Sequence, residues 1–214
     1  KGIQRFLRAG KPVVLIDRKM EQTDCDCVLV DNKGAAEEAV ERLFAAGHRK
    51  IGIIAGPDKI YTAKERLSGY RKAFYGKGMT PGEEFIARGD YTIAGGARAM
   101  RELMEKNKEM TAVFISNYEM TVGAMMELND LGVSVPEELS VIGFDNEDFA
   151  RALRPRLSIV TQPSGEIARR AAELLLGRLE RETAAKQPGN LESERPETVT
   201  LKTGFVEGRS VKYL

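Results

Sequence analysis

Short apolar runs alternate with longer amphipathic stretches along the whole chain. The apolar runs, rich in Val and Ile, predict strands at 13–17, 27–31, 50–55, 85–89, 111–116, 139–144 and 157–161. The amphipathic stretches predict helices at 33–46, 63–77, 93–106, 118–131 and 166–181. Part of a helix is expected over 1–9 and a last short strand around 199–203.

The stretch 33–46 shows the helical spacing clearly, because Ala39, Val40, Leu43 and Phe44 recur every three or four positions. Gly47 then stands where a helix end needs a left-handed residue. Uninterrupted apolar strands such as 51–54 are typical of a parallel sheet that is covered on both faces. The pattern therefore predicts βαβ units in a doubly wound α/β architecture.

Composition excludes several classes of protein. Of 214 residues, 42% are hydrophobic and 30% are charged, which is the balance of a soluble globular chain. Lys and Arg (33) nearly equal Asp and Glu (32), so the net charge of +1 gives no overall basic footprint for nucleic acid. No segment has the form of a membrane span or a signal peptide, so we expect a cytoplasmic protein. Cys25 and Cys27 are too few for a disulfide framework.

Polar side chains follow five of the predicted strands, and they are Asp17, Asp90–Tyr91, Ser116–Asn117, Asp145–Asn146 and Gln162. Ligands of open α/β sheets bind beyond the carboxyl ends of the strands. Each residue taken singly is equally explained as a turn former or helix N-cap. Their recurrence at five strand ends favours a polar ligand crevice that would suit the hydroxyls of a sugar.

The motifs of several catalytic and cofactor-binding classes are missing. The sequence has no G-x-x-x-x-G-K-[ST] phosphate loop, no G-x-G-x-x-G and no G-x-S-x-G elbow. His48 is the single histidine, and its place between a helix end and a buried strand indicates a structural role. One His and two Cys cannot assemble an ordinary zinc site. We therefore expect binding without catalysis, with no catalytic residue, metal or cofactor.

Five stretches resemble, in order, the motifs of the lactose-repressor (LacI/GalR) family of bacterial transcription regulators. Residues 46–57 (AGHRKIGIIAGP) are similar to its G-H-x-x-I…G-P signature, and 66–70 (RLSGY) to its R-x-x-G-[FWY] helix. Residues 116–124 (SNYEMTVGA) are similar to N-D-x-M-A-x-G-A, 135–145 (VPEELSVIGFD) to its most distinctive stretch, and 155–163 (PRLSIVTQP) to P-x-L-T-T-[IV]-x-Q-P.

The resemblance implies a periplasmic-binding-protein-like fold of two doubly wound subdomains with an effector crevice. Residues 1–31 and 162–191 would form part of the N-terminal subdomain, and residues 32–161 with 197–205 the C-terminal one. The polar stretch 183–196 would be an exposed connection, and the chain would cross between subdomains near 31–32, 162 and 198. A family member would carry a helix-turn-helix DNA-binding head before residue 1, so that head is expected to be absent from this chain.

The family motifs also imply the residues that would contact the effector, and these are Asp17, Thr62, Arg66, Tyr91, Asn117, Asp145 and Gln162. Asp17 and Asp145 would accept hydrogen bonds from hydroxyl groups of a sugar. Arg66 and Asn117 would donate, and Tyr91 would stack on an apolar ring face.

Two positions depart from the family pattern. Tyr118 and Asn146 stand where carboxylates are usual. Lys64 is expected to face along the same helix end as Arg66. A less acidic, more basic crevice would suit a sugar phosphate or a sugar acid.

The stretch 120–131 carries more apolar residues than one buried face needs. Thr121, Ala124, Leu128 and Leu131 would form that face, while Val122, Met125 and Met126 project elsewhere. A helix covered on all sides would explain this pattern equally well. The resemblance implies instead that this helix contributes to a homodimer interface.

Together these features predict the effector-binding and dimerisation region of a LacI-family regulator. It would couple a small sugar-like effector allosterically to operator DNA, bound through the head domain. The alternatives are a docking module controlled by a phosphorylated carrier protein, a sugar-binding protein of transport type, and an enzyme of doubly wound fold.

Overall fold

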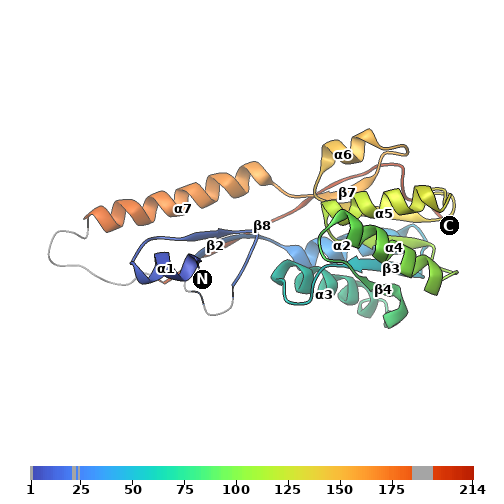
Figure 1. Ribbon diagram of the computed structural model, residues 1–214, viewed down its shortest axis with the longest axis horizontal. Coiled ribbons are helices and arrows are strands. Elements are labelled where there is room, and N and C mark those ends of the chain that lie inside the picture. Colours follow the sequence, from blue (N-terminus) through green and yellow to red (C-terminus); the bar gives the residue numbers. More distant parts are fainter. Residues whose placement is uncertain (1, 21–22, 24, 185–194) are drawn as a thin grey trace. The chain divides into compact units, whose positions relative to one another are not determined.

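The computed structural model describes residues 2–20, 23, 25–184 and 195–214, and Figure 1 labels all of its α-helices and several of its strands. The chain divides into two compact units. Unit 1 consists of Lys1–Asp31 and Pro163–Lys202, and unit 2 consists of Asn32–Gln162 and Thr203–Leu214. Each unit has its own sheet and its own helices.

Unit 2 contains a six-stranded sheet in the order β4-β3-β5-β6-β7-β9. Its strands are β3 (Ile51–Ala55), β4 (Ile86–Arg88), β5 (Ala112–Ile115), β6 (Ser140–Phe144), β7 (Ser158–Thr161) and β9 (Gly204–Val206). The first five strands are parallel, and β9 closes the edge of the sheet antiparallel to β7. Because the five strands run in the same direction, their carboxyl ends share one edge.

Helices cover both faces of this sheet, as the apolar strands predict. Residues of α2 (Asn32–Ala45) and α3 (Tyr61–Tyr75) pack with Ile53 and Phe114 in one core cluster. Residues of α4 (Ile93–Lys106), α5 (Tyr118–Asp130) and α6 (Glu147–Ala152) pack with Ile54 and Ile115 in another. A short 3-10 helix, η1 (Glu83–Phe85), leads into β4. Successive side chains of a strand point to opposite faces, so each strand feeds both clusters.

Glycines bring the helix pairs of unit 2 unusually close. A Cβ atom at Gly69 of α3 would collide with the carbonyl oxygen of Lys33 in α2. A Cβ at Gly123 of α5 would collide in the same way with the carbonyl oxygen of Ile93 in α4. Larger residues at these two positions would force the helices apart.

Unit 1 has a three-stranded parallel sheet in the order β1-β2-β8, formed by Val14–Ile16, Asp26–Val30 and Thr198–Leu201. Its helices are α1 (Gly2–Arg8) and α7 (Ser164–Ala184), and Ile167 and Ala171 of α7 pack on Val28 and Val30 of β2.

A buried ion pair also joins α7 to this sheet. Arg178 donates from Nε and Nη2 to the two carboxylate oxygens of Asp26, at 2.9 and 2.8 Å. The backbone N–H of Glu197 donates to the same carboxylate at 2.8 Å. Burial opposes ionisation of Asp26, but these donors outweigh it and hold the pKa of the carboxyl below its usual value.

The predicted α/β fold with parallel sheets is confirmed, and every predicted strand and helix has a counterpart. The sequence analysis missed η1, α6 and β9, which span three to six residues each and are too short to show a period. One assignment was wrong, because residues 197–205 were given as a whole to the C-terminal subdomain. Strand β8 pairs with β2 in unit 1, so the chain returns to unit 2 only after Lys202.

Two other boundaries need comment. Gln162, expected in the N-terminal subdomain, belongs to unit 2. Residues 185–191 of the expected N-terminal share, and 185–194 of the expected polar connection, lie outside the described residues. In the described part of the chain, no helix has the length and apolar character needed to cross a membrane.

His48 ties the C-terminal segment to the corner between α2 and β3. Its ring is buried, with Nε2 at 3.0 Å from the carbonyl oxygen of Lys212 and Nδ1 at 2.9 Å from the hydroxyl of Thr111. A carbonyl only accepts, so Nε2 carries the proton and Nδ1 accepts from Thr111. The adjacent Gly47 has a φ of 97°, as predicted for a helix end, and the N–H of Leu214 donates to the carbonyl of Ala46 nearby.

Replacing His48 by Ala should lower the free energy of unfolding by about 1–3 kcal/mol, because it removes two partly buried hydrogen bonds and leaves the Thr111 hydroxyl and the Lys212 carbonyl without this partner. Urea denaturation at neutral pH measures this loss. His48→Gln keeps a donor at the end of the side chain and should lose less.

Stability should also depend on pH through His48. Burial lowers the pKa of this histidine below its usual value of 6.5, so the folded state takes up the proton less readily than the unfolded state. The stability that the neutral, hydrogen-bonded His48 contributes is therefore present above pH 6.5 and is lost as the pH falls below that value. Urea denaturation across this range should show a steeper loss for the natural chain than for His48→Gln. Equal slopes would contradict the assignment.

Candidate functional site

Six of the seven predicted effector residues belong to unit 2 and lie at the carboxyl edge of its sheet. Tyr91, Asn117, Asp145 and Gln162 follow β4, β5, β6 and β7, in that order. Thr62 and Arg66 come from the first turns of α3, which follows β3. The seventh residue, Asp17, follows β1 in unit 1 and donates its backbone N–H to the carbonyl of Val28 at 2.9 Å.

Arg66 is the buried charged residue at this edge of the sheet. Its side chain is 3% exposed, and its Nε donates to Asn32 Oδ1 at 2.8 Å while Nη1 donates to the carbonyl oxygen of Ser116 at 2.6 Å. The guanidinium lies 3.7 Å from the ring centroid of Phe144, which adds a cation–π contact. The arginine thereby joins α2, α3, β6 and the end of β5.

Asn117 begins α5 and is engaged at both ends of its amide. Its Oδ1 accepts from the backbone N–H of Met120 at 3.0 Å, which is the geometry of an N-cap. Its Nδ2 donates to Glu119 Oε2 at 2.6 Å. The amide nitrogen carries two N–H groups, so one remains for another acceptor.

Tyr91 and Thr62 meet beside the strand end of β3. The phenol oxygen of Tyr91 lies 3.2 Å from the hydroxyl of Thr62. The ring lies so close to Gly56 that a Cβ at that position would collide with it. Gly56 is the glycine of the G-P motif, and here its role is to admit the aromatic ring.

Asp145 and Gln162 form a pair at the ends of β6 and β7. The Nε2 of Gln162 donates to Asp145 Oδ1 through a short hydrogen bond. The amide oxygen of the same side chain, Gln162 Oε1, is buried and has no hydrogen-bond partner among the described residues, and the same holds for the hydroxyl of Ser116. Buried polar atoms without a partner are rare in proteins, so each of these two atoms is a candidate for a hydrogen bond with a ligand.

The backbone singles out three of the predicted residues. In the part of the chain that the structure describes, the non-glycine residues with positive φ are Asp17 (51°), Tyr91 (65°) and Asp145 (86°). Side chains disfavour this region, and such strain of about 1–3 kcal/mol per residue clusters at functional sites. The left-handed turn at each of the three strand ends redirects the side chain that follows the strand.

Residues outside the seven predicted effector contacts also take part. Asn32 and the carbonyl of Ser116 hold Arg66, Phe144 lies against it, and Glu119 engages Asn117. Asn32 carried a detectable signal, since it is a polar residue at the start of a helix, two positions after the buried strand β2. The other contacts join distant parts of the chain and leave no local pattern.

Lys64 does not stand beside Arg66, contrary to the sequence-based expectation. Two positions apart on a helix are about 200° apart around its axis. Arg66 therefore points into the core while Lys64 is exposed on the outer side of α3.

The other departures from the family pattern have local roles. The ring of Tyr118 makes an edge contact with Phe149, with centroids 5.5 Å apart, and Asn146 caps α6 by accepting from the N–H of Phe149 at 2.9 Å. Glu119 keeps a carboxylate against Asn117. The expected basic character of this edge is thereby reduced.

Val122, Met125 and Met126 lie outside the fully buried face of α5, as predicted, although Met125 also packs partly against the core. Met126 is 55% exposed, and Val122 and Met125 are half-buried. Thr121, Ala124 and Leu128 form the buried face as expected, whereas Leu131 was wrongly included. Leu131 is the C-cap that follows the last turn of α5, and it is exposed.

The described residues contain no group of three His, Cys, Asp or Glu side chains arranged to hold a metal ion. The chemistry of the edge is that of hydrogen bonding. It combines carboxylate acceptors, amide donors, a hydroxyl and an aromatic ring, which is the donor and acceptor set that polyhydroxylated ligands need.

Comparisons with known proteins give the family. The periplasmic binding protein-like domain family matches residues 40–211, which is well over half of the chain. The transcriptional repressor CytR of Escherichia coli is 38% identical over 169 residues, covering 79% of this chain and 50% of that protein. The chain thus spans about half the length of the curated relatives it matches.

Solved structures agree with this match. The transcriptional regulator CelR, in a complex with cellobiose, superposes with a TM-score of 0.84 at 31% identity, covering 97% of this chain and 61% of that one. A LacI-family sugar-binding transcriptional regulator from Escherichia coli, complexed with phosphate, has a TM-score of 0.78 at 31% identity, covering 100% and 73%.

The class that the fold and the polar strand ends define is thus a periplasmic-binding-protein-like domain. Within that class, the chain belongs to the LacI family of transcriptional regulators.

Arg66→Lys should lower the free energy of unfolding by about 1–3 kcal/mol. A lysine cannot place two fixed donors on Asn32 and Ser116, and it lacks the planar group that lies on Phe144. Urea denaturation gives the difference, with Arg71→Lys on the outer side of the same helix as the control, expected within about 0.5 kcal/mol of the natural chain. Equal losses of stability in the two variants would refute the conclusion that the contacts of Arg66 with Asn32, Ser116 and Phe144 stabilise the fold.

Proposed function

We propose that this chain is the effector-binding and dimerisation region of a LacI-family transcription regulator that senses a small sugar or sugar derivative. The observation that carries the proposal is the coincidence of left-handed backbone with predicted effector positions. Asp17, Tyr91 and Asp145 were selected from strand ends and motifs, and they are the non-glycine residues of the described chain with positive φ. Strain at three such positions is consistent with side chains held ready for a ligand.

The donor and acceptor groups support a neutral polyhydroxylated effector over a strongly anionic one. Arg66 is engaged by Asn32 and Ser116, and Lys64 lies on the other side of α3. Asp145 offers a carboxylate, and the unpaired Gln162 Oε1 and Ser116 hydroxyl offer further acceptors. We therefore propose that sugars or nucleosides bind more tightly than sugar phosphates or sugar acids, which reverses the expectation from the sequence.

In this proposal the ligand and the operator are thermodynamically linked. An effector that binds one conformation of the regulator better than another shifts the population toward it, and operator affinity changes by the same coupling free energy. Operator DNA would be bound through a head domain outside this chain, and the regulator would act in the cytoplasm. The function is one of binding and not of catalysis. Because the relatives are transcriptional regulators, this reading is favoured over a transport-type binding protein or an enzyme.

A thermal-shift screen tests the effector site. Neutral sugars, nucleosides, sugar phosphates and sugar acids are added separately to the chain, with an extrinsic dye because the sequence has no Trp. A ligand at about a hundred times its dissociation constant adds roughly 2.7 kcal/mol of stability, which raises the melting midpoint clearly. We expect one neutral class to do so.

The variant Asp145→Asn should abolish the shift, because the amide keeps the shape of the side chain but loses the charged acceptor. Asp58→Asn, an exposed carboxylate outside the predicted effector set, is the matched control and should leave the shift unchanged. Flat curves across the panel, from a protein with a cooperative melt, would contradict the small-molecule proposal and favour control by a phosphorylated carrier protein.

The homodimer is proposed to use the outer side of α5. Met126→Asp and Val122→Asp each place a charge on this apolar surface and should convert dimers to monomers in sedimentation velocity. Tyr213→Asp removes an apolar side chain that is 72% exposed elsewhere in unit 2 and should leave the dimer intact. A Met126→Asp protein that stays dimeric at low micromolar concentration would overturn this assignment.

A further inference from the structure

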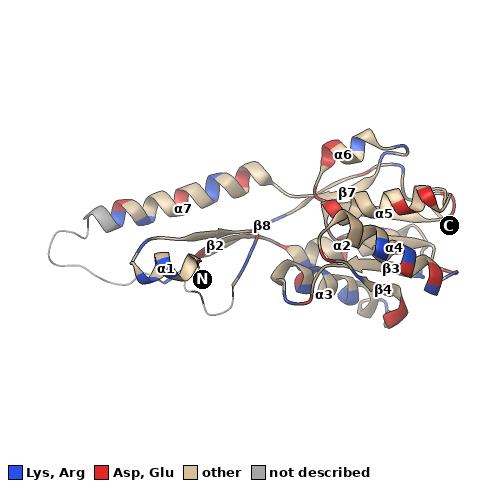
Figure 2. Ribbon diagram, in the orientation of Figure 1, with Lys and Arg blue, Asp and Glu red and all other residues tan. Residues whose placement is uncertain are grey.

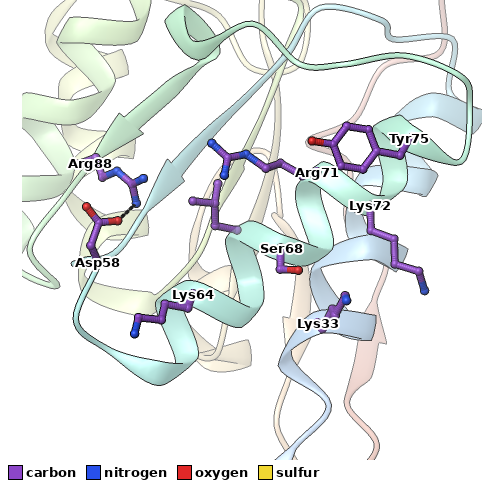
Figure 3. A pocket seen from close by; sticks show the side chains of 9 residues that line it. Lys33, Asp58, Lys64, Ser68, Arg71, Lys72, Tyr75 and Arg88 are labelled. Atoms are coloured by element: carbon purple, nitrogen blue, oxygen red, sulfur yellow. Dashed lines mark ion pairs between the residues drawn. The ribbon is translucent and has the colours of Figure 1, made fainter.

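An open groove runs along the outer side of α3 in unit 2, away from the side of the helix that carries Thr62 and Arg66. Its volume is about 530 Å³. Figure 3 shows the lining side chains of α3, among them Lys64, Arg71 and Tyr75, following one another along one side of the helix. They recur every three or four residues, which is the spacing of a single helical face.

The groove is predominantly basic. Lys64, Arg71 and Lys72 line it from α3, Lys33 lines it from the start of α2, and Arg88 lines it from the end of β4. Five cations therefore face a groove whose lining contains one carboxylate, that of Asp58. Unit 2 as a whole carries both signs of charge (Figure 2), so this concentration of one sign is local.

The cations of the groove form ion pairs that are in contact with solvent, and a ligand carboxylate can replace the present partner of each cation. Arg71 pairs with Glu83 at 2.7 Å, and these side chains are 34% and 77% exposed. Lys72 pairs with Glu37 at 2.8 Å, and Arg88 pairs with Asp58 at one end of the groove (Figure 3). Ion pairs in contact with water contribute little to stability, so an incoming carboxylate can replace the present partner at small cost.

Two features of the groove indicate what kind of ligand it could hold, namely its length and its lining. The α3 residues from Lys64 to Tyr75 span about 16 Å at 1.5 Å per residue, which an extended peptide of about five residues covers. Tyr75, which is 57% exposed, and the buried Leu67 also line the groove, so it has aromatic and apolar parts. The cationic side chains that line it are long Lys and Arg side chains of an open groove, which suits a peptide better than an enclosed small molecule.

We propose that this groove docks an acidic, carboxylate-rich segment of a partner protein. Charge complementarity carries the proposal, since separate carboxylates on a peptide can engage cations that are interspersed with Asp58, Glu37 and Glu83. A continuous row of nucleic-acid phosphates would meet those same carboxylates, and the chain has a net charge of only +1. This docking surface is independent of the proposed effector site.

The test uses a fluorescein-labelled peptide, Glu-Glu-Phe-Glu-Glu-Glu, and fluorescence anisotropy with the 214-residue chain. We expect saturable binding that weakens as NaCl is raised from about 50 to about 200 mM, because salt screens exposed charges. The same peptide with Gln in place of every Glu should not bind. A labelled single-stranded oligodeoxythymidine of similar length is measured in parallel.

The variant Lys33→Glu/Lys64→Glu should weaken binding of the acidic peptide by about tenfold or more. Both positions lie near helix N-termini, where an acidic side chain complements the helix dipole, so the melting midpoint should be maintained. The matched control, Lys108→Glu/Arg209→Glu, reverses two exposed charges outside the groove and should change the affinity by less than about twofold.

Three results would overturn the proposal. One is the absence of saturable peptide binding to the natural chain. Another is an equal loss of affinity in the control variant, which would show a general effect of net charge. The third is tighter binding of the oligonucleotide than of the peptide, with loss in Lys33→Glu/Lys64→Glu, which would assign the groove to nucleic acid.

Discussion

Parallel pairing in unit 2 sets the geometry on which the candidate site depends. Five largely buried strands need helices on both faces of the sheet, and the helices between successive strands of the sheet then connect strands that run in the same direction. All five carboxyl ends consequently reach one edge. Because the strand ends meet there, residues far apart in the sequence, such as Tyr91 and Gln162, lie at the same polar edge. No additional structural element is needed to bring them there.

Helix α3 carries basic side chains both on its buried side and on its exposed side. Its inner side carries Arg66, whose charge is tolerated in the interior because a side-chain oxygen, a carbonyl and an aromatic face surround it. Its outer side carries exposed cations that exchange partners with water and with neighbouring carboxylates. The contrast comes from the helical period alone, since residues two positions apart point in nearly opposite directions.

Much of the fold was predictable because its signals are local. A run such as 51–55 followed by a helical spacing is visible in any window of the chain, and so is a polar residue directly after an apolar run. Asp145 and Asn117 were found in this way. The left-handed backbone of Tyr91 and Asp145 was not predicted, because neither residue type indicates a positive φ in the way that glycine does.

Other features depended on long-range partners. The bond from Arg66 to Asn32 joins residues 34 positions apart, and the bond from His48 to Lys212 spans 164. Strand β8 was placed in the wrong unit because a short alternating strand fits the edge of either sheet, and only the pairing with β2 decides between them. A helix face was misjudged at Leu131 because the sequence does not fix the last turn of α5 to within one residue.

The division of unit 2 into two separate segments has a consequence for its synthesis. Strand β9, and the carbonyl of Lys212 that His48 contacts, are translated only after the ribosome has passed through the intervening stretch of unit 1. A nascent chain that has reached Gln162 already contains five strands of the sheet, but the edge at β7 still lacks its antiparallel neighbour. Unpaired strand edges are the sites at which incomplete domains associate with one another. The sheet of unit 2 can therefore be completed only after the intervening stretch of unit 1 has been translated, and until then the edge at β7 lacks its partner strand.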